Sequence, residues 1–293
     1  MYASRVKTRK NKLSTLVFSV ATLLLFTSIN QAFANLLITP TRVEFSERDR
    51  SAKVSLVNTS NEIKTYKIYW REQYQQQDGQ YVPFKAGERD FPSANRMLRY
   101  SPRQVTLKPG ERQHVRLGLR RPKDLAAGEF RSHLVFDAQP NKAQLAKKEN
   151  SGGIKLHLNL SFSIPIIVRE GLIDTQSSVG KVDLVTRERD GKVYTGAYID
   201  MNRAGKFSTF GNVKVFWKDN GNQKERIIGV QNNIAIYPEL AMRRLLIGFK
   251  DHPKKSGIMR IIYEGDGEYK GQVFAEKTLQ INELNYRREE NYK

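Results

Sequence analysis

The sequence predicts an all-β protein built from two sandwich domains. Short runs of alternating apolar and polar residues recur at the spacing typical of β-sandwiches, with turn-forming residues between them. No stretch before residue 138 shows a helical period. The roughly 259 residues that follow residue 34 are too many for one small sandwich and suit two domains of ordinary size. Because the chain has no cysteine, each domain must be held together by its core alone.

Residues 1–34 have the features of a secretory signal peptide. A basic start over 5–12 precedes an apolar stretch over 16–26, and Ala32-Phe33-Ala34 offers a small-x-small cleavage site. We therefore expect export and a mature chain that begins near Asn35. An uncleaved membrane anchor is the alternative, because anchors differ from signal peptides mainly in apolar length. No later run reaches the roughly 18 apolar residues that a membrane span requires, so we expect no span after cleavage.

Two sets of strands follow the signal peptide. We expect the first domain, residues 35–169, to contain strands over 52–57, 65–70, 104–107, 113–119 and 130–138. We expect the second domain, residues 170–284, to contain strands over 179–186, 193–201, 213–217, 233–237, 243–249, 258–263 and 272–281. The charged tail, residues 285–293, is expected to fray.

An unusually long strand is predicted over residues 154–168, where every even position is apolar. It follows a polar loop over 139–153 that ends in two glycines. Pro165 cannot donate to a hydrogen-bond ladder, which indicates a sheet edge at that point. A long apolar edge suggests pairing with another chain, whereas the other interpretation is a core strand whose apolar row faces inward. Periodicity alone does not decide between these two interpretations.

The charge of the chain favours acidic partners. The formal net charge is +20, and five of the cations lie in the signal peptide, so about 15 positive charges remain on the mature chain. Export and the absence of a nucleic-acid-binding motif argue against nucleic acid as the partner. An exported binder of acidic polymers remains an alternative.

The sequence lacks the motifs of enzymes and metal sites. It has no nucleophile elbow, no glycine-rich phosphate loop and no His-Glu-x-x-His helix. None of its histidines has a partner at metal-ligand spacing; they are His114, His133, His157 and His252. His133 and His157 could meet across adjacent strands, but two ligands alone make a weak site. We therefore expect no enzymatic activity, no cofactor and no metal.

Residues 99–117, Arg-Tyr-Ser-Pro-Arg-Gln-Val-Thr-Leu-Lys-Pro-Gly-Glu-Arg-Gln-His-Val-Arg-Leu, closely resemble the periplasmic pilus-assembly chaperones of the chaperone-usher pathway. Residues 121–125 and 128–134 look like the archaic lineage of that family, and residues 202–208 and 211–213 are similar to its C-terminal domain. The resemblance implies two immunoglobulin-like domains in a boomerang arrangement. It also implies that the G strand of the first domain is lent to a pilus subunit that lacks a strand.

On this resemblance, the residues that enter the subunit are Leu156, Leu158 and Leu160, with Ile154 as a fourth. Family members bind the C-terminal carboxylate of the subunit with an Arg on the first strand and a Lys on the G strand. Arg42 stands at the first position, where a guanidinium can pair with a carboxylate in bidentate fashion.

The second position of this carboxylate clamp aligns with Pro165, so another cation must supply the missing charge. The resemblance leaves three candidates open: Arg103, Arg116 and Arg131. Arg169 aligns with an interdomain Arg of the family, and Arg131 stands where an acidic partner of that Arg is usual. We therefore expect a hinge network that differs from that of the family.

The leading hypothesis is a periplasmic chaperone that captures pilus subunits and delivers them to an outer-membrane usher without a nucleotide. An exported structural or adhesive protein built from the same sandwiches is the alternative. The sequence leaves open which subunits are bound, what the finished fibre binds, and whether the free protein covers its apolar edge by self-association.

Overall fold

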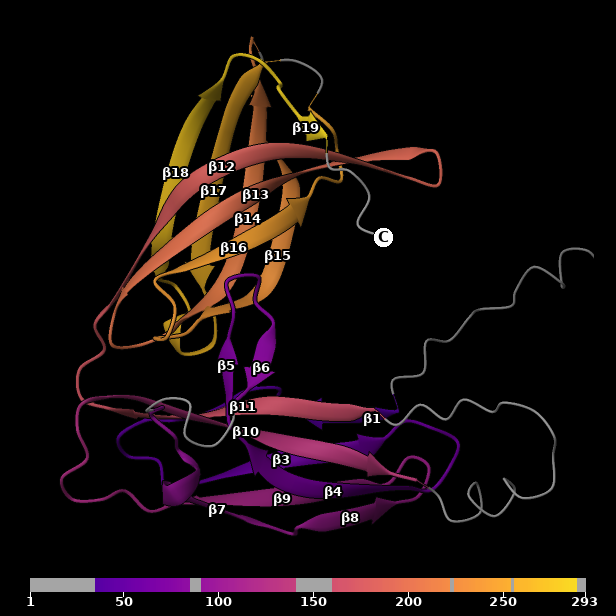
Figure 1. Ribbon diagram of the computed structural model, residues 1–293, viewed down its shortest axis with the longest axis vertical. Helices are drawn as coiled ribbons and strands as arrows, with labels where there is room; N and C mark the ends of the chain where they lie inside the picture. Colours follow the sequence, from indigo (N-terminus) through magenta and orange to yellow (C-terminus); the bar gives the residue numbers. More distant parts are fainter. Residues whose placement is uncertain (1–34, 85–90, 141–159, 222–223, 254–255, 289–293) are drawn as a thin grey trace, which may run out of the picture.

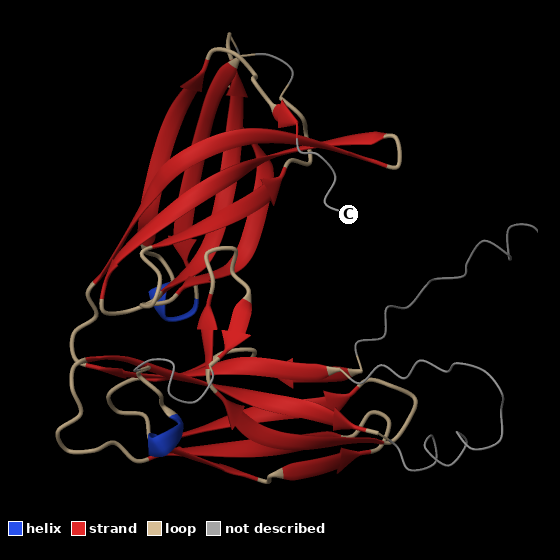
Figure 2. Ribbon diagram, in the orientation of Figure 1, coloured by secondary structure: helices blue, strands red, loops and turns tan. Residues whose placement is uncertain are grey.

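The computed structural model describes residues 35–84, 91–140, 160–221, 224–253 and 256–288. In these residues the chain forms two β-sandwiches set at an angle to one another, like the arms of a boomerang (Figures 1 and 2). The helices there are two 3-10 turns, η1 (Asn95–Met97) and η2 (Gly267–Tyr269). The expected all-β, two-sandwich fold is therefore confirmed, whereas the signal peptide lies outside the described residues.

The first sandwich has the strand arrangement of an immunoglobulin domain. One sheet has the order β1 (Leu36–Thr39), β3 (Ser51–Asn58), β9 (Arg112–Leu119) and β7 (Leu98–Ser101). The facing sheet has the order β2 (Val43–Phe45), β11 (Ser161–Glu170), β10 (Gly128–Gln139), β4 (Lys64–Arg71) and β8 (Gln104–Leu107). These orders correspond to strands A-B-E-D opposite strands G-F-C, and β1 and β2 place the first segment of the chain in both sheets.

The core of this sandwich is formed by every second side chain of its strands. In β9, Val115, Leu117 and Leu119 point into the core, while the intervening residues are exposed or lack a side chain. Tyr66 and Ile68 of β4 face them from the other sheet and are buried. The period-two pattern of the sequence is therefore the pattern of inward-facing residues.

The second sandwich is built in the same way. One sheet has the order β16 (Met242–Gly248), β13 (Lys192–Gly205), β12 (Thr175–Arg189) and β19 (Arg287–Arg288). The other has the order β15 (Arg226–Ile236), β14 (Thr209–Asp219), β17 (Gly257–Gly265) and β18 (Val273–Ile281). Trp217 is fully buried in the core between these sheets.

The predicted strands of both domains are present where the structure describes them, with ends that differ by several residues in places; the described part of the long strand predicted over 154–168 is β11, which begins at Ser161. The expectation that the charged tail frays is wrong for its first residues. Tyr286 packs against the second core, Arg287 and Arg288 pair in parallel with β12, and Arg288 forms an ion pair with Glu188. Packing of Tyr286 holds this segment in spite of its charge.

A short hairpin joins the two sandwiches and was not predicted. It consists of β5 (Gln73–Gln75) and β6 (Tyr81–Pro83), follows β4, and extends from the first sandwich to the second (Figure 1). The backbone nitrogen of Arg244 in the second sandwich donates a hydrogen bond to the carbonyl oxygen of Gln77 near its tip. The hairpin therefore forms part of the contact between the sandwiches.

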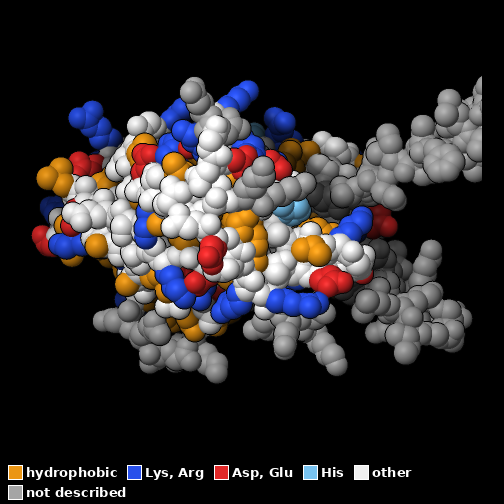
Figure 3. All heavy atoms as spheres, turned by 90° about the horizontal axis from the view of Figure 1, so that it is seen from above, with side chains coloured by type: hydrophobic (Ala, Val, Ile, Leu, Met, Phe, Trp, Pro, Cys, Tyr) orange, Lys and Arg blue, Asp and Glu red, His pale blue; other side chains and the backbone are white. Residues whose placement is uncertain are grey.

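On the face of the molecule seen in Figure 3, basic and acidic side chains are interspersed, and no single basic patch covers it. On this face the basic side chains therefore do not form one binding stripe. No helix in the described ranges is long and apolar enough to cross a membrane.

Candidate functional site

The candidate site begins at a partly open edge of β11. On one side, β10 pairs with β11 over its whole length, from Ser161 to Glu170. On the other side, β2 pairs with it in parallel over Ile166–Val168 alone. Among the described residues, the stretch 161–165 therefore has a strand on one side only. Pro165 is the last residue of this stretch, so the missing backbone donor lies where the sequence predicted a sheet edge.

The apolar row of β11 changes its environment along the strand. Ile164, Ile166 and Val168 belong to the first core, and Phe162 packs against that core while remaining partly exposed. Leu160 is 50% exposed. The inward-facing interpretation is therefore correct for the row from Ile164 onward, whereas the row becomes accessible at Leu160.

Three of the four expected donor residues, Ile154, Leu156 and Leu158, lie outside the described residues. Leu160 is described, and its carbonyl oxygen accepts a hydrogen bond from the backbone nitrogen of Ala138 at 3.4 Å. This contact places Leu160 beside the end of β10. β1 begins at the same end of the sandwich. Tyr66 pairs with Ala138 in the sheet, and its hydroxyl donates a hydrogen bond to the carbonyl oxygen of Asn35, which directly precedes β1.

Arg42 lies immediately before β2, at the other end of the open edge. Its Nη2 contacts Oε1 of Glu268 at 2.8 Å and Oε2 of Glu44 at 3.4 Å. Its guanidinium also stacks over the ring of Phe210, 4.6 Å from the ring centre. Its Nε and Nη1 are buried and have no acceptor among the described residues. Arg42 is therefore a largely buried cation with two unused donor nitrogens.

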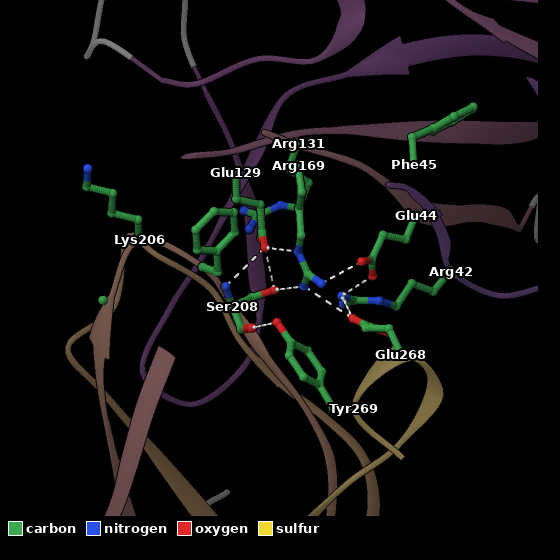
Figure 4. A network of polar contacts seen from close by, with 12 residues as sticks. Arg42, Glu44, Phe45, Glu129, Arg131, Arg169, Lys206, Ser208, Glu268 and Tyr269 are labelled. Carbon is green, nitrogen blue, oxygen red and sulfur yellow. Dashed lines mark hydrogen bonds and ion pairs between the residues drawn. The ribbon is translucent and has the colours of Figure 1, made fainter. Parts of the chain in front are cut away.

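Arg169, at the end of β11, lies beside Arg42. Figure 4 shows the two guanidinium groups pointing toward one another, with Glu44 and Glu268 bridging both. Nη1 of Arg169 is 2.5 Å from Glu44, and its Nη2 is 3.2 Å from Glu268 and 3.1 Å from the hydroxyl of Ser208. Since Ser208 and Glu268 belong to the second sandwich, Arg169 spans the interface between the two domains.

The expectation that Arg131 replaces the acidic partner of Arg169 is wrong, because Glu129 is that partner. Nε of Arg169 donates to Glu129 at 3.0 Å, and the same carboxylate accepts bonds from the backbone nitrogen and hydroxyl of Ser208. In the register of the sheet Glu129 lies directly opposite Arg169, whereas Arg131 lies opposite Ile167. Both residues lie one position beyond the ends of the strands predicted over 130–138 and 154–168, so their pairing became visible only from the register of the longer strands β10 and β11.

The three candidates for a second anchoring cation have different locations. Arg103 lies just before β8, the strand at the far edge of the sheet from β2. Arg116 is exposed on β9, in the other sheet of the sandwich. Arg131 lies on β10, next to β11, and is buried. It makes a bidentate contact with Glu239 of the second sandwich, at 2.5 and 3.2 Å, and its guanidinium lies 3.6 Å from the ring centre of Tyr237. Of the three, Arg131 alone lies at the interface between the sandwiches.

The charges of this network shift the pKa of its members. Burial works against the charged form of Arg42, but Tyr237 and the nearby carboxylates outweigh it and raise its pKa. Burial raises the pKa of Glu44, and a hydrogen bond with Glu268 raises it further. For Glu268, burial opposes ionisation, yet the bond from Glu44 and the charge of Arg42 lower its pKa overall. Glu44 is therefore the carboxyl group that most readily holds a proton.

The β5–β6 hairpin connects β11 to the second sandwich. Nε2 of Gln73 donates to the hydroxyl of Ser163 on the open stretch of β11 at 3.0 Å. The side chain of Gln75 donates to the carbonyl oxygen of Ala235 at 3.2 Å and accepts from the backbone nitrogen of Tyr237 at 3.4 Å. The backbone nitrogen of Gln75 donates to Glu239. The only sequence signal of this hairpin is the turn-forming pair Asp78-Gly79 between Tyr74 and Tyr81.

His133 is buried beside this site on β10. In the part of the chain that the structure describes, its two ring nitrogens have no hydrogen-bond partner, and no group of three or more His, Cys, Asp and Glu side chains could hold a metal ion. The predicted neighbour His157 lies outside the described residues. Burial, and then the charge of Arg131, lower the pKa of His133 to about 3.

No protein-family model and no curated protein match this chain. Solved structures that resemble it include chains from the CsuC–CsuE chaperone–tip adhesion subunit complex of archaic chaperone-usher pili of Acinetobacter baumannii and the CupB2 chaperone of Pseudomonas aeruginosa. The first is 12% identical, with coverage of 88% of this chain and 100% of that chain and a TM-score of 0.40. The second is 13% identical, with coverage of 84% and 100% and a TM-score of 0.42.

A third similar structure is that of the Salmonella enterica SafA pilin in complex with the SafB chaperone. It is 14% identical, with coverage of 84% of this chain and 96% of that chain and a TM-score of 0.40. Each of these three structures is of a pilus chaperone or of a complex that contains one.

Proposed function

We propose that this protein is a periplasmic chaperone that binds pilus subunits by supplying a missing strand and delivers them to an outer-membrane usher. The observation that carries the proposal is the open edge of β11. A strand from another chain can pair with residues 161–165, because β2 occupies this edge only from Ile166 onward. The expected donor residues Leu156, Leu158 and Leu160 would then insert into the core of the bound subunit, with Leu160 nearest to β11.

The position of Arg42 fits the end of such an added strand. β2 runs parallel to β11 and begins at Val43, which pairs with Ile166. An added strand that runs parallel to β11 must therefore stop just before Val43, with its C-terminus next to Arg42. The unused Nε and Nη1 of Arg42 are donors for a carboxylate at that point. The strand register and the anchor would thus be set by the same residue.

Burial of the leucines would supply most of the attraction. Full burial of a leucine side chain contributes about 1.5–3 kcal/mol, so Leu160, which is half exposed, would add about 1 kcal/mol. Leu156, Leu158 and Ile154 would add to this, less the entropy that the two chains lose when they associate. Aspartate at any of these positions would place a charge inside the partner's core.

The test is capture of subunits from the periplasm by the tagged protein, with the captured bands identified. We expect the wild-type protein to retain a pilus subunit, and we expect Leu158→Asp and Leu160→Asp to lose it while remaining folded. Leu172→Asp is the matched control, because Leu172 lies in the segment between the sandwiches and is 93% exposed. Normal capture by Leu158→Asp and Leu160→Asp would contradict donor-strand binding. Recovery of the wild-type chain outside the cell would favour the adhesive alternative.

A further inference from the structure

The planar guanidinium group of Arg42 has two edges at which a carboxylate can make two hydrogen bonds, and both edges include Nη2. A carboxylate pairs either with Nε and Nη2 or with Nη1 and Nη2, because the N–H bonds of each of these pairs are parallel. Nε and Nη1 are unused, whereas Nη2 is engaged by Glu268 at 2.8 Å and Glu44 at 3.4 Å. A bidentate ligand of Arg42 must therefore compete for the one nitrogen that is already occupied.

Glu268 is the carboxylate best placed to leave. It lies in η2, a single turn of the second sandwich, and its side chain is 24% exposed. Glu44 and Glu268 both contact Arg169 as well as Arg42, but Glu44 is the closer of the two to Arg169, at 2.5 Å against 3.2 Å, and it lies in β2, which pairs with β11. Glu129 is almost completely buried and is fixed by Ser208 and Arg169. Glu268 alone of the three comes from the opposite domain on a short turn.

Charge balance gives a second reason for exchange. Two guanidiniums, those of Arg42 and Arg169, face the carboxyl groups of Glu44, Glu129 and Glu268. Because the pKa of Glu44 is raised, the group is balanced when Glu44 holds a proton. A further carboxylate would leave the buried cluster with an excess negative charge, which is costly in a site of low polarity. Entry of one carboxylate is therefore favoured when another departs.

We propose that Glu268 is an internal substitute for the ligand's carboxylate: it holds Arg42 in the free protein and is displaced when a C-terminal carboxylate docks. The inference rests on the proposed function for the identity of that ligand, a peptide chain end. Glu268 then acts as a specificity-determining residue, because only a carboxylate that pairs with Arg42 better than Glu268 does can enter. Its displacement would also release one of the contacts of η2 with Arg169.

The test uses acetylglycine as a minimal chain end and acetylglycinamide as its uncharged counterpart. Binding is followed by the nitrogen and proton shifts of the Arg42 side chain, assigned by their loss in Arg42→Lys. We expect Glu268→Gln to bind acetylglycine about 10-fold more tightly than the wild-type protein, and neither protein to bind the amide. Glu264→Gln is the control, because it removes the same charge from a residue that contacts Lys214.

Equal affinity of the wild-type protein and Glu268→Gln for acetylglycine would overturn the inference. The inference would also be overturned if the double variant Arg42→Lys/Glu268→Gln bound acetylglycine as tightly as Glu268→Gln does, because the acetylglycine would then bind at a site other than Arg42. A crystal structure of the wild-type protein with its captured subunit provides a test that needs no variant. Glu268 should have left Nη2 of Arg42, and a retained contact near 2.8 Å would refute its displacement. Failure of the wild-type protein to capture any subunit would instead refute the proposed function, and the acetylglycine titration would still decide the role of Glu268.

Discussion

The first sandwich is expected to lose stability in mild acid, because His133 takes up a proton far more readily in the unfolded chain than in the folded one. The imidazole is 2% exposed, lies edge-on to the ring of Tyr81 at 4.9 Å between ring centres, and has no hydrogen-bond partner among the described residues. Burial and the charge of Arg131 lower its pKa from 6.5 to about 3. The folded state therefore holds this histidine neutral, whereas the unfolded chain takes up a proton near pH 6.5.

The sign and size of the effect follow from this difference. Below pH 6.5 the unfolded state binds more protons than the folded state, so the contribution of His133 is complete above pH 6.5 and is lost as the pH falls toward 3. At pH 5 the unfolded state gains about 2 kcal/mol from protonating this residue, and at pH 4 it gains about 3 kcal/mol. These are large fractions of the free energy of unfolding of a typical domain.

The perturbation that isolates this effect is His133→Phe. Phenylalanine keeps the ring contact with Tyr81 and removes two nitrogens that make no hydrogen bond. Urea unfolding is measured at pH 8, 5 and 4 in the Trp217→Phe background, so that the fluorescence of Trp70 reports the first sandwich alone. His114→Phe is the control, because His114 is exposed on β9.

Between pH 8 and pH 5, His133→Phe should gain about 2 kcal/mol in free energy of unfolding relative to its parent, and His114→Phe should not. Other groups also titrate over this range, but they are common to both proteins and cancel in the difference. Parallel pH profiles for His133→Phe and its parent would refute the argument, because they would mean that the buried imidazole is protonated as easily as the unfolded one.

Two further predictions concern the interface between the sandwiches. Arg169→Met leaves the buried carboxylate of Glu129 without its guanidinium partner and should lower the free energy of unfolding in urea by about 3–5 kcal/mol. The double variant Arg169→Met/Glu129→Gln should recover part of this loss, and no recovery would show that the unpaired charge is not the cause. Gln75→Ala removes two side-chain bonds to the second sandwich and should cost about 1–3 kcal/mol and speed hydrogen exchange at the amide of Tyr237. Gln76→Ala, an exposed neighbour in the same hairpin, should change stability by less than about 0.5 kcal/mol, and equal effects of the two substitutions would contradict the role of Gln75.

The strands were predictable because their signal is local. In β9 and β14, inward-facing residues recur at every second position, and that period is visible without any partner strand. The β5–β6 hairpin was missed because its strands are three residues long and Gln75 is buried by the second sandwich. A buried glutamine has no signature in a sequence, since its burial depends on bonds to Ala235 and Tyr237, which are about 160 residues away along the chain.

The sequence by itself determined the two-sandwich class, the apolar row that leads into β11, the edge at Pro165 and the choice of Arg42 as the anchor candidate. These follow from side-chain alternation, from the missing donor of proline and from a motif resemblance. Only the tertiary structure decided that the row is buried from Ile164 onward and that Glu129 is the partner of Arg169. It also decided that Arg42 is already held by Glu268. The reason is physical: alternation shows which side of a strand is apolar, but burial and ion pairing are set by the elements that pack against it from distant parts of the chain.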